Sequence, residues 1–431
     1  MIKPCPTFLA LVLMLVPLTA QAEPRTWRDA TGKFTIEAEL VEVNDDAVVL
    51  KKPNGKTVTV PLARLSPTDR RFVETLDAPS SPLANLSADA EINALLEEIR
   101  KKSDMPALVA AIVTSDGLET FGVAGVRKRG ASASARASDL WHLGSDTKAM
   151  TATLVARLVE DGVLDWDTTL AEVFADDGVT IHPDFQGVTI RQLLTHRAGL
   201  PANLNLVEYL GEDATKERRH ALSELAKPPA KPPGTEFAYS NLGYVIVGAV
   251  IEKLTGKSWQ ENMVEQIFEP LKMKSAGFGG LGTPGRVDQP WPHTADGKPV
   301  PQNGPAVDNP PVMGPAGRVH CTIQDWSRFI ADLLGGLNGK PALLEADSYQ
   351  TLSTPPTGGD YAMGWIVAER GWAGGKVLTH SGSNTMNYAT VWIAPERDFA
   401  LLACTNQGGD DAAAACDTAV AALIQHRTSK E

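Results

Sequence analysis

Gly144-Ser145-Asp146-Thr147-Lys148 is the stretch on which the assignment of the fold depends. A helical stripe of apolar residues follows it and ends near Asp161-Gly162. Ser145 is therefore expected at a helix N-terminus, with Lys148 one turn further along the same face. This spacing brings an amine near a hydroxyl, at the end of the helix dipole that favours negative charge. Taken alone, the pattern also fits an N-cap serine followed by a solvated lysine.

Two further polar motifs stand downstream. Tyr239-Ser240-Asn241 lies at a loop-to-helix junction, where a phenol beside a lysine ammonium is expected to have a lowered pKa and to act as a general base. His380-Ser381-Gly382-Ser383 ends an expected strand. Because Gly382 has no side chain, a substrate can approach the edge of this strand. There the N–H of Ser383 is expected to donate to an oxyanion. Each motif alone also has a purely structural interpretation, as a packing tyrosine with a capping asparagine or as a solvated strand end.

The order Ser-x-x-Lys, Tyr-x-Asn, His-x-Gly resembles the serine β-lactamase and penicillin-binding-protein family, in its class C and esterase branch. The segment Leu193–Leu200 is similar to the same family, and the resemblance extends from about residue 88 to residue 424. It implies an α+β fold, in which an antiparallel sheet flanked by terminal helices accompanies a mostly helical subdomain. The strand patterns at 107–113, 118–124, 362–368, 388–394 and 399–405, and the helical pattern at 411–424, favour the same arrangement.

The resemblance also implies roles for the matching residues. Ser145 is the nucleophile that forms an acyl-enzyme, Lys148 lowers the pKa of the serine and relays protons, and Tyr239 acts as base and then as acid. Asn241 binds a substrate amide or orients Lys148. No metal or organic cofactor is required for this chemistry.

The third motif carries the substrate-binding roles that the resemblance implies. The N–H groups of Ser145 and Ser383, beside Gly382, form the oxyanion hole, and His380 flanks the acyl donor. Penicillin-recognising members usually carry lysine at the position of His380. A histidine with the ordinary imidazole pKa of about 6.5 is mostly neutral at pH 7 and attracts a carboxylate less strongly. Arg318, which replaces a usually small or apolar residue, is a candidate source of the missing positive charge.

The N-terminal segment has the pattern of a signal peptide. Lys3 precedes the apolar run Phe8–Leu18, and Ala20-Gln21-Ala22 fits a small-x-small cleavage site, so residues 1–22 are expected to be removed from an exported, periplasmic or secreted protein. No later apolar run is long enough to span a membrane, so no span is expected in the mature chain. The three cysteines beyond the apolar run, Cys321, Cys404 and Cys416, fit buried free thiols.

Residues 23–77 read as a separate small β domain. Alternation from Phe34 to Leu40, with further strand patterns at 47–50 and 57–60, favours an SH3-like barrel. The segment Arg25–Phe34 resembles the SH3-like homology domain of the endocytic adaptor Sla. That resemblance implies a fold and a protein or peptide partner, although a spacer or docking role fits equally. A Pro/Ser-rich linker is expected at 78–87, before a hydrolase domain at 88–431.

The whole chain is predicted to be an exported serine hydrolase acting on esters or small amides. The alternatives are a D-amino-acid peptidase or β-lactamase acting on cell-wall-like substrates, and a binding protein that has kept the hydrolase fold without its activity. The 431 residues carry 40 Lys+Arg against 52 Asp+Glu, a net charge of −12. This acidic balance argues against nucleic acid as a partner, because nucleic acid attracts basic surfaces.

Overall fold

The computed structural model describes residues 25–30, 34–44, 47–70, 73, 88–283, 285–301 and 307–429. The chain divides into two compact units, 1–81 and 82–431. The signal peptide expected at 1–22 and the linker expected at 78–87 lie outside the described residues.

The first unit is an antiparallel meander of four strands. Its strands pair in chain order: β1 (Arg25–Arg28), β2 (Thr35–Asn44), β3 (Ala47–Lys51) and β4 (Thr57–Pro61), followed by the 3-10 turn η1 (Leu62–Arg64). Trp27 is buried among Val48, Leu50 and Leu65, and its indole N–H donates to the Ala38 carbonyl at 3.0 Å. This small all-β unit is compatible with the expected barrel.

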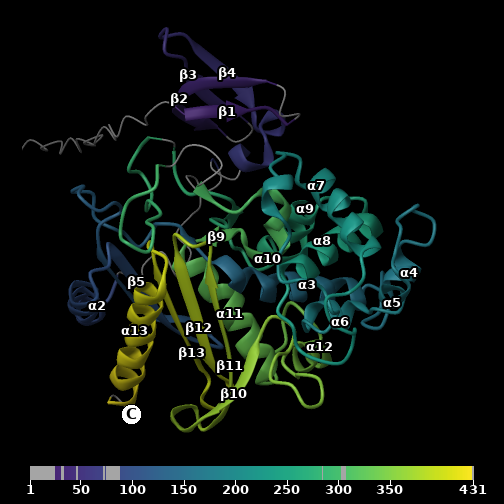
Figure 1. Ribbon diagram of the computed structural model, residues 1–431. Helices are drawn as coiled ribbons and strands as arrows, with labels where there is room; N and C mark the ends of the chain where they lie inside the picture. The colour runs from purple at the N-terminus through teal and green to yellow at the C-terminus, as the bar shows by residue number, and fades with distance from the viewer. Residues whose placement is uncertain are drawn as a thin grey trace, which may run out of the picture. The chain divides into compact units, whose positions relative to one another are not determined.

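A six-stranded antiparallel sheet forms the centre of the second unit (Figure 1). In spatial order its strands are β10 (Ile366–Arg370), β11 (Gly375–Ser383), β12 (Tyr388–Ala394), β13 (Phe399–Thr405), β5 (Ala107–Thr114) and β6 (Gly117–Gly125). Strand β13 pairs with β5, so segments from the two ends of the domain lie side by side. The expected α+β fold, with a sheet closed by both ends of the domain, is confirmed.

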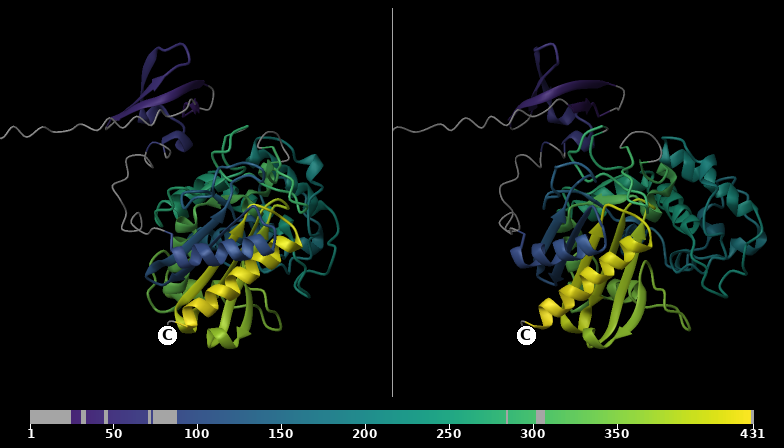
Figure 2. Two further views of the ribbon diagram at one scale, coloured as in Figure 1. Left: turned by 90° about the vertical axis from the view of Figure 1, so that its left-hand side faces the viewer. Right: turned by 60° about the vertical axis from the view of Figure 1, so that its left-hand side comes forward.

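Helices cover both faces of this sheet. α2 (Ala90–Lys102) and α13 (Asp410–Thr428) lie together against one face, as Figure 2 shows. α11 (Ile323–Leu337) packs on β5 and β13 from the other face. Alternation along β5 divides its side chains between the two cores, because Leu108 faces the terminal helices whereas Val109 faces the main core.

The remaining elements build the helical subdomain and its connections to the sheet. They are η3 (Gly144–Asp146), α3 (Thr147–Glu160), α4 (Leu170–Val173), α5 (Pro183–Gln186), α6 (Ile190–Leu194), η4 (Leu206–Glu208), α7 (Ala214–Ala221), η5 (Leu222–Ala226), α8 (Asn241–Thr255), α9 (Trp259–Met263), η6 (Val264–Phe268), η8 (Pro311–Met313), α10 (Gly314–Gly317), α12 (Ala346–Leu352), η9 (Gly371–Ala373) and η10 (Pro395–Arg397). A three-stranded sheet joins β7 (Trp141–His142), β9 (Val319–Cys321) and β8 (Gly277–Phe278) in that order.

The start of one strand differs from the sequence prediction by several residues. The strand expected at 362–368 begins only at Ile366. The preceding residues form a turn in which the Ala362 N–H donates to the Trp365 carbonyl at 2.7 Å. Gly364 has φ +85°, and a Cβ there would lie 2.6 Å from the Cα of Ala149, so this segment packs against α3 instead of continuing the sheet.

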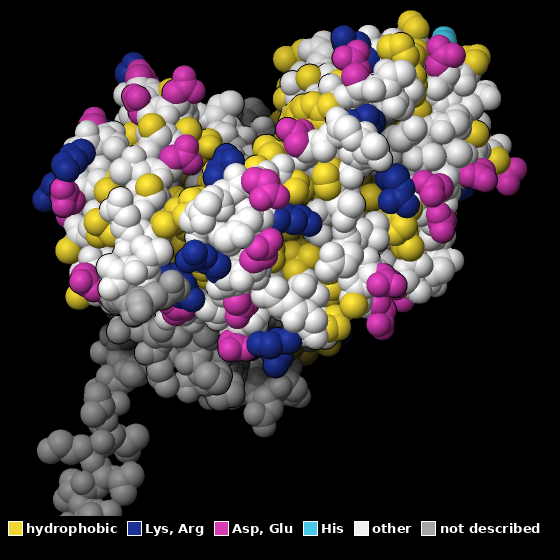
Figure 3. Space-filling model, turned by 90° about the horizontal axis from the view of Figure 1, so that it is seen from below, with side chains coloured by type: hydrophobic (Ala, Val, Ile, Leu, Met, Phe, Trp, Pro, Cys, Tyr) yellow, Lys and Arg dark blue, Asp and Glu magenta, His cyan; other side chains and the backbone are white. Residues whose placement is uncertain are grey.

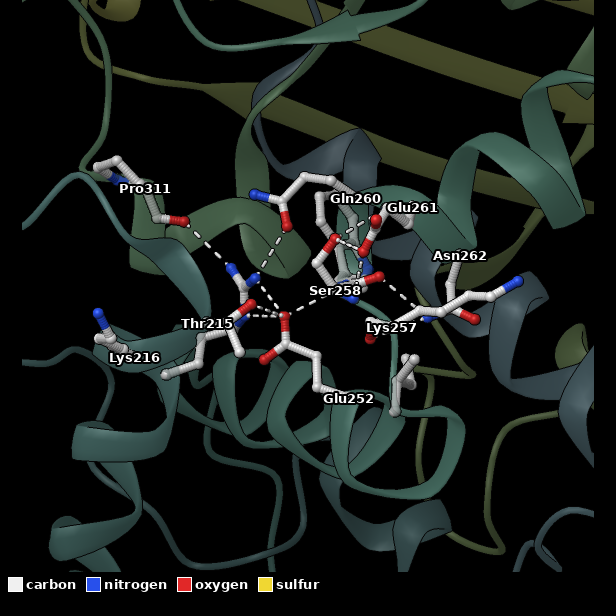
Figure 4. Close-up of polar contacts among 12 residues, drawn as sticks. Thr215, Lys216, Glu252, Lys257, Ser258, Gln260, Glu261, Asn262 and Pro311 are labelled. Carbon is white, nitrogen blue, oxygen red and sulfur yellow. Dashed lines mark hydrogen bonds and ion pairs between the residues drawn. The ribbon is translucent and has the colours of Figure 1, made fainter. Parts of the chain in front are cut away.

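A buried ion pair ties α7, α8 and α9 together. Arg218 on α7 is fully buried and pairs with Glu252 on α8; its guanidinium also donates to Gln260 on α9 and, at 3.2 Å, to the Pro311 carbonyl. Figure 4 shows Glu252, Gln260 and Pro311 converging from separate segments. Because Pro311 stands just before α10, this cluster anchors the segment that reaches the candidate site.

The surface and the thiols are unexceptional. On the face drawn in Figure 3, acidic and basic side chains are interspersed.

Cys321, Cys404 and Cys416 are buried free thiols, as the sequence favours. Within the described part of the chain, no helix combines the length and the apolar character that a membrane crossing needs.

Candidate active site

Ser145 and Lys148 come together at the start of α3. The Lys148 ammonium lies 3.1 Å from the Ser145 Oγ and also donates to two 2.7 Å acceptors, the Asn241 Oδ1 and the Ala316 carbonyl. Lys148 is fully buried, and this burial lowers its pKa to about 7, although the nearby Asp146 opposes the shift. The amine is therefore partly deprotonated at neutral pH.

Tyr239 reaches the same serine from the segment before α8. Its hydroxyl donates to the Ser145 Oγ at 3.0 Å, and its ring packs against His196 with centroids 4.3 Å apart. Burial raises the pKa of Tyr239 to about 12. The expectation that a neighbouring lysine lowers this pKa is therefore wrong, because the effect of burial outweighs that of the hydrogen bond with Ser145, and the nearby Asp146 raises the pKa further.

Asn241 is the first residue of α8, which Ser240 caps by accepting from the Gly243 N–H. The Asn241 amide accepts from Lys148 through its oxygen and donates through its nitrogen to the Asn203 Oδ1 at 2.7 Å. Of the two roles that the sequence leaves open, this contact matches the orienting of Lys148.

Strand β11 passes directly against η3, and two glycines make the approach possible. A Cβ on Gly382 would lie 2.0 Å from the Leu143 carbonyl oxygen and 2.4 Å from the Ser145 nitrogen. A Cβ on Gly144, whose φ is +52°, would lie 2.3 Å from the Ser383 nitrogen. These contacts bring the backbone nitrogens of Ser145 and Ser383 close together.

His380 lies next to the serine but is held by the protein itself. Its side chain is 4% exposed, its Nδ1 lies 3.5 Å from the Asp146 Oδ1, and its Nε2 lies 3.0 Å from the Tyr361 hydroxyl. Asp146 is equally buried, and burial raises its pKa. Sequence reasoning missed Asp146 and Tyr361. Asp146 stands inside the Ser-x-x-Lys motif, but no local pattern pairs it with a histidine far along the chain.

Arg318 is also engaged internally. Its Nε lies 3.2 Å from the Oδ2 of the buried Asp308, whose other oxygen lies 2.9 Å from the His142 Nε2 and accepts from Asn384 at 3.1 Å. The pKa of Asp308 is about 2, because these neighbours outweigh the effect of burial. In the ranges that the structure describes, no group of His, Cys, Asp and Glu side chains is arranged to hold a metal ion.

Two family models match the chain. A family model described as Beta-lactamase matches residues 92–425, and one described as SLA1 homology domain 1 matches residues 17–80. Penicillin-binding protein 4 of Amycolatopsis lactamdurans is 27% identical over 329 residues, which cover 72% of this chain and 84% of that protein. Unguisins hydrolase ungD of Aspergillus violaceofuscus is 26% identical over 369 residues, which cover 77% of this chain and 62% of that protein, less than two thirds of its length. The octameric penicillin-binding protein homologue from Pyrococcus abyssi superposes with a TM-score of 0.64 at 23% identity, covering 78% of this chain and 77% of that one.

Proposed function

Because this chain belongs to the beta-lactamase family of serine hydrolases, we propose that it hydrolyses esters or small amides through an acyl-enzyme on Ser145. The observation that carries this proposal is the meeting of three side chains from two separate segments. The Ser145 Oγ lies 3.1 Å from the Lys148 Nζ and 3.0 Å from the Tyr239 hydroxyl. These are the distances at which a proton moves between a nucleophile and its base.

The contacts of Lys148 suit a neutral amine as the base. Such an amine has two N–H bonds and one lone pair. The Asn241 oxygen and the Ala316 carbonyl, each at 2.7 Å, take the two N–H bonds, so the lone pair is left for the Ser145 hydroxyl. Tyr239 stays protonated and donates to the Ser145 oxygen as negative charge develops there.

Acyl transfer then follows two balanced steps. The Ser145 oxygen bonds to the substrate carbonyl carbon, whose oxygen becomes an oxyanion held by the N–H groups of Ser145 and Ser383. The bond to the leaving alcohol or amine breaks as that group takes the proton which the serine gave to Lys148, with Tyr239 as the relay. Water repeats the sequence on the acyl-enzyme and releases the acid.

An exposed aromatic ring near the site supports ester or amide substrates with an apolar portion. Phe237 stands two residues before Tyr239 and is 45% exposed, although it is an aromatic side chain. Its ring lies 5.8 Å from that of His196 and 5.4 Å from that of Tyr361. Covering such a ring with an apolar substrate group is favourable.

Comparing three substrate classes tests the proposal. An aryl ester, a chromogenic cephalosporin and a D-Ala-D-Ala peptide are offered to the wild type and to Ser145→Ala. We expect the aryl ester to be turned over with the highest kcat/KM and the Ser145→Ala variant to lose that activity. Equal rates for the variant and the wild type on the ester would exclude the acyl-enzyme.

Hydrolysis of D-amino-acid peptides or β-lactams is the second candidate. The 27% identity to a protein named penicillin-binding protein 4 favours it. In the same comparison, a preference for the peptide or the cephalosporin over the ester would select this candidate.

We also propose that the protein is exported and that its first unit binds a protein or peptide partner. Export is supported by the sequence pattern of residues 1–22, and partner binding by the match to SLA1 homology domain 1. Mass measurement of the mature protein after expression in a bacterial host tests export. A chain beginning near Glu23 in the periplasm is expected, and a full-length chain in the cytoplasm is the contrary result.

A further inference from the structure

Asp146 is a buried carboxylate immediately beside the nucleophile. Its exposed fraction is 2%, and its contact with a basic side chain is with the His380 Nδ1, at 3.5 Å. The other ring nitrogen of His380 meets the Tyr361 hydroxyl. When Asp146 is ionised, the Asp146–His380 pair has no net charge if the imidazole is protonated, and it is negative if the imidazole is neutral. The pair therefore offers a substrate carboxylate no net positive charge.

The remaining basic side chains at the site are also held by internal groups. Lys148 is surrounded by the acceptors described above, and Arg318 is paired with Asp308, a second buried aspartate. His196 accepts from the Ser240 N–H, and burial lowers its pKa well below the usual value, so that it is neutral. Asp146 and Asp308 thus offset the basic groups that a negatively charged substrate would need.

We propose that Asp146 and Asp308 are specificity-determining residues, which restrict this active site to acyl donors without a carboxylate. This inference rests on the proposed function and adds the charge of its substrate. A substrate carboxylate that enters the site would lie near two buried aspartates. The basic side chains beside them, His380 and Arg318, already contact those aspartates. Charged groups interact strongly where water is excluded.

A pair of substrates of equal shape tests the inference. Mono-4-nitrophenyl adipate and 4-nitrophenyl 6-methylheptanoate differ only in a terminal carboxylate in place of a branched pair of methyl groups. For the wild type, we expect kcat/KM for the neutral ester to exceed that for the anionic ester by about tenfold or more. A ratio below about twofold would overturn the inference.

Variants assign the effect to the two aspartates. Asp146→Asn and Asp308→Asn each remove one buried carboxylate and leave His380 or Arg318 without its partner. Each is expected to reduce the ratio about tenfold. Asp325→Asn is the matched control, because Asp325 is a buried aspartate of α11 held by Ser275 and Arg328, and its ratio should not change. Because two variants are measured, the effect can still be assigned if one of them fails to fold.

The outcomes separate this inference from the proposed function. Comparable hydrolysis of both esters through Ser145, or a wild-type ratio in folded Asp146→Asn and Asp308→Asn, would contradict the charge restriction alone. Failure of the wild type to hydrolyse either ester, together with no acyl adduct on Ser145, would contradict the proposed function and this inference with it.

Discussion

Lys148 is an amine enclosed by the protein, and its environment sets the chemistry at the residue scale. The sequence indicates Ser145, Lys148, Tyr239 and Asn241, because these residues stand in short, ordered motifs. The direction of the Tyr239 pKa and the contact of Asp146 with His380 are not predictable in this way. Both depend on burial and on contacts between distant segments, which local patterns do not contain.

The activity should depend on pH through Lys148. Burial lowers the pKa of this lysine to about 7, so the neutral amine that accepts the serine proton becomes populated as the pH rises through that value. We expect kcat/KM for a neutral aryl ester to rise about tenfold per pH unit on the acid side and to level off about one unit above pH 7. Tyr239, with its pKa raised to about 12, stays protonated throughout. If kcat/KM did not change from acid to alkaline pH, Lys148 would not be the base. In the Lys148→Arg variant, the inflection of kcat/KM near pH 7 should disappear.

At the scale of elements, the contact of β11 with η3 brings the backbone nitrogens of Ser145 and Ser383 close together, where we propose the oxyanion hole. A Cβ on Gly382 would collide with backbone atoms on η3, so Gly382→Ala should push the strand away from Ser145. We expect kcat/KM to fall by about 10²–10³, the usual effect of losing one oxyanion donor. Gly371→Ala is the control, because a Cβ there meets nothing within 4 Å. Full activity in a folded Gly382→Ala variant would be inconsistent with this oxyanion hole.

The buried Arg218–Glu252 pair should determine much of the stability of the helical subdomain. Arg218→Met leaves Glu252 buried without its countercharge and is expected to lower the free energy of unfolding by about 3–5 kcal/mol. Lys257→Ala, which breaks the exposed pair with Glu265, should change the free energy of unfolding far less, because water screens that pair. Denaturant unfolding measures both variants, and equal effects would show that burial does not set the contribution of these pairs.

Boundaries of elements were predictable where hydrophobic periodicity was uninterrupted. The strands expected at 388–394 and 399–405 have those bounds in the structure. The strand expected at 362–368 was placed too early, because the contact of Gly364 with α3 breaks it. The sequence does not indicate the ion pair of Arg218 with Glu252, because it joins two separate helices and belongs to no periodic pattern.

At the scale of the whole molecule, the two units have separate hydrophobic cores. Trp27 centres the core of the first unit, whereas the site and its sheet belong to the second. A chain of residues 88–431 is therefore expected to hydrolyse a small ester with kcat/KM within about twofold of the full chain. The ester assay on both proteins measures this. Strong loss of activity in a folded 88–431 chain would assign the first unit a part in catalysis.

The most direct test of the central claim is intact-mass analysis after treatment with a fluorophosphonate, followed by peptide mapping. The meeting of Lys148 and Tyr239 on the Ser145 oxygen predicts one adduct per chain, carried by Ser145 and absent from Ser145→Ala. A wild-type protein that is folded yet unmodified, or an adduct mapped to another residue, would contradict the account.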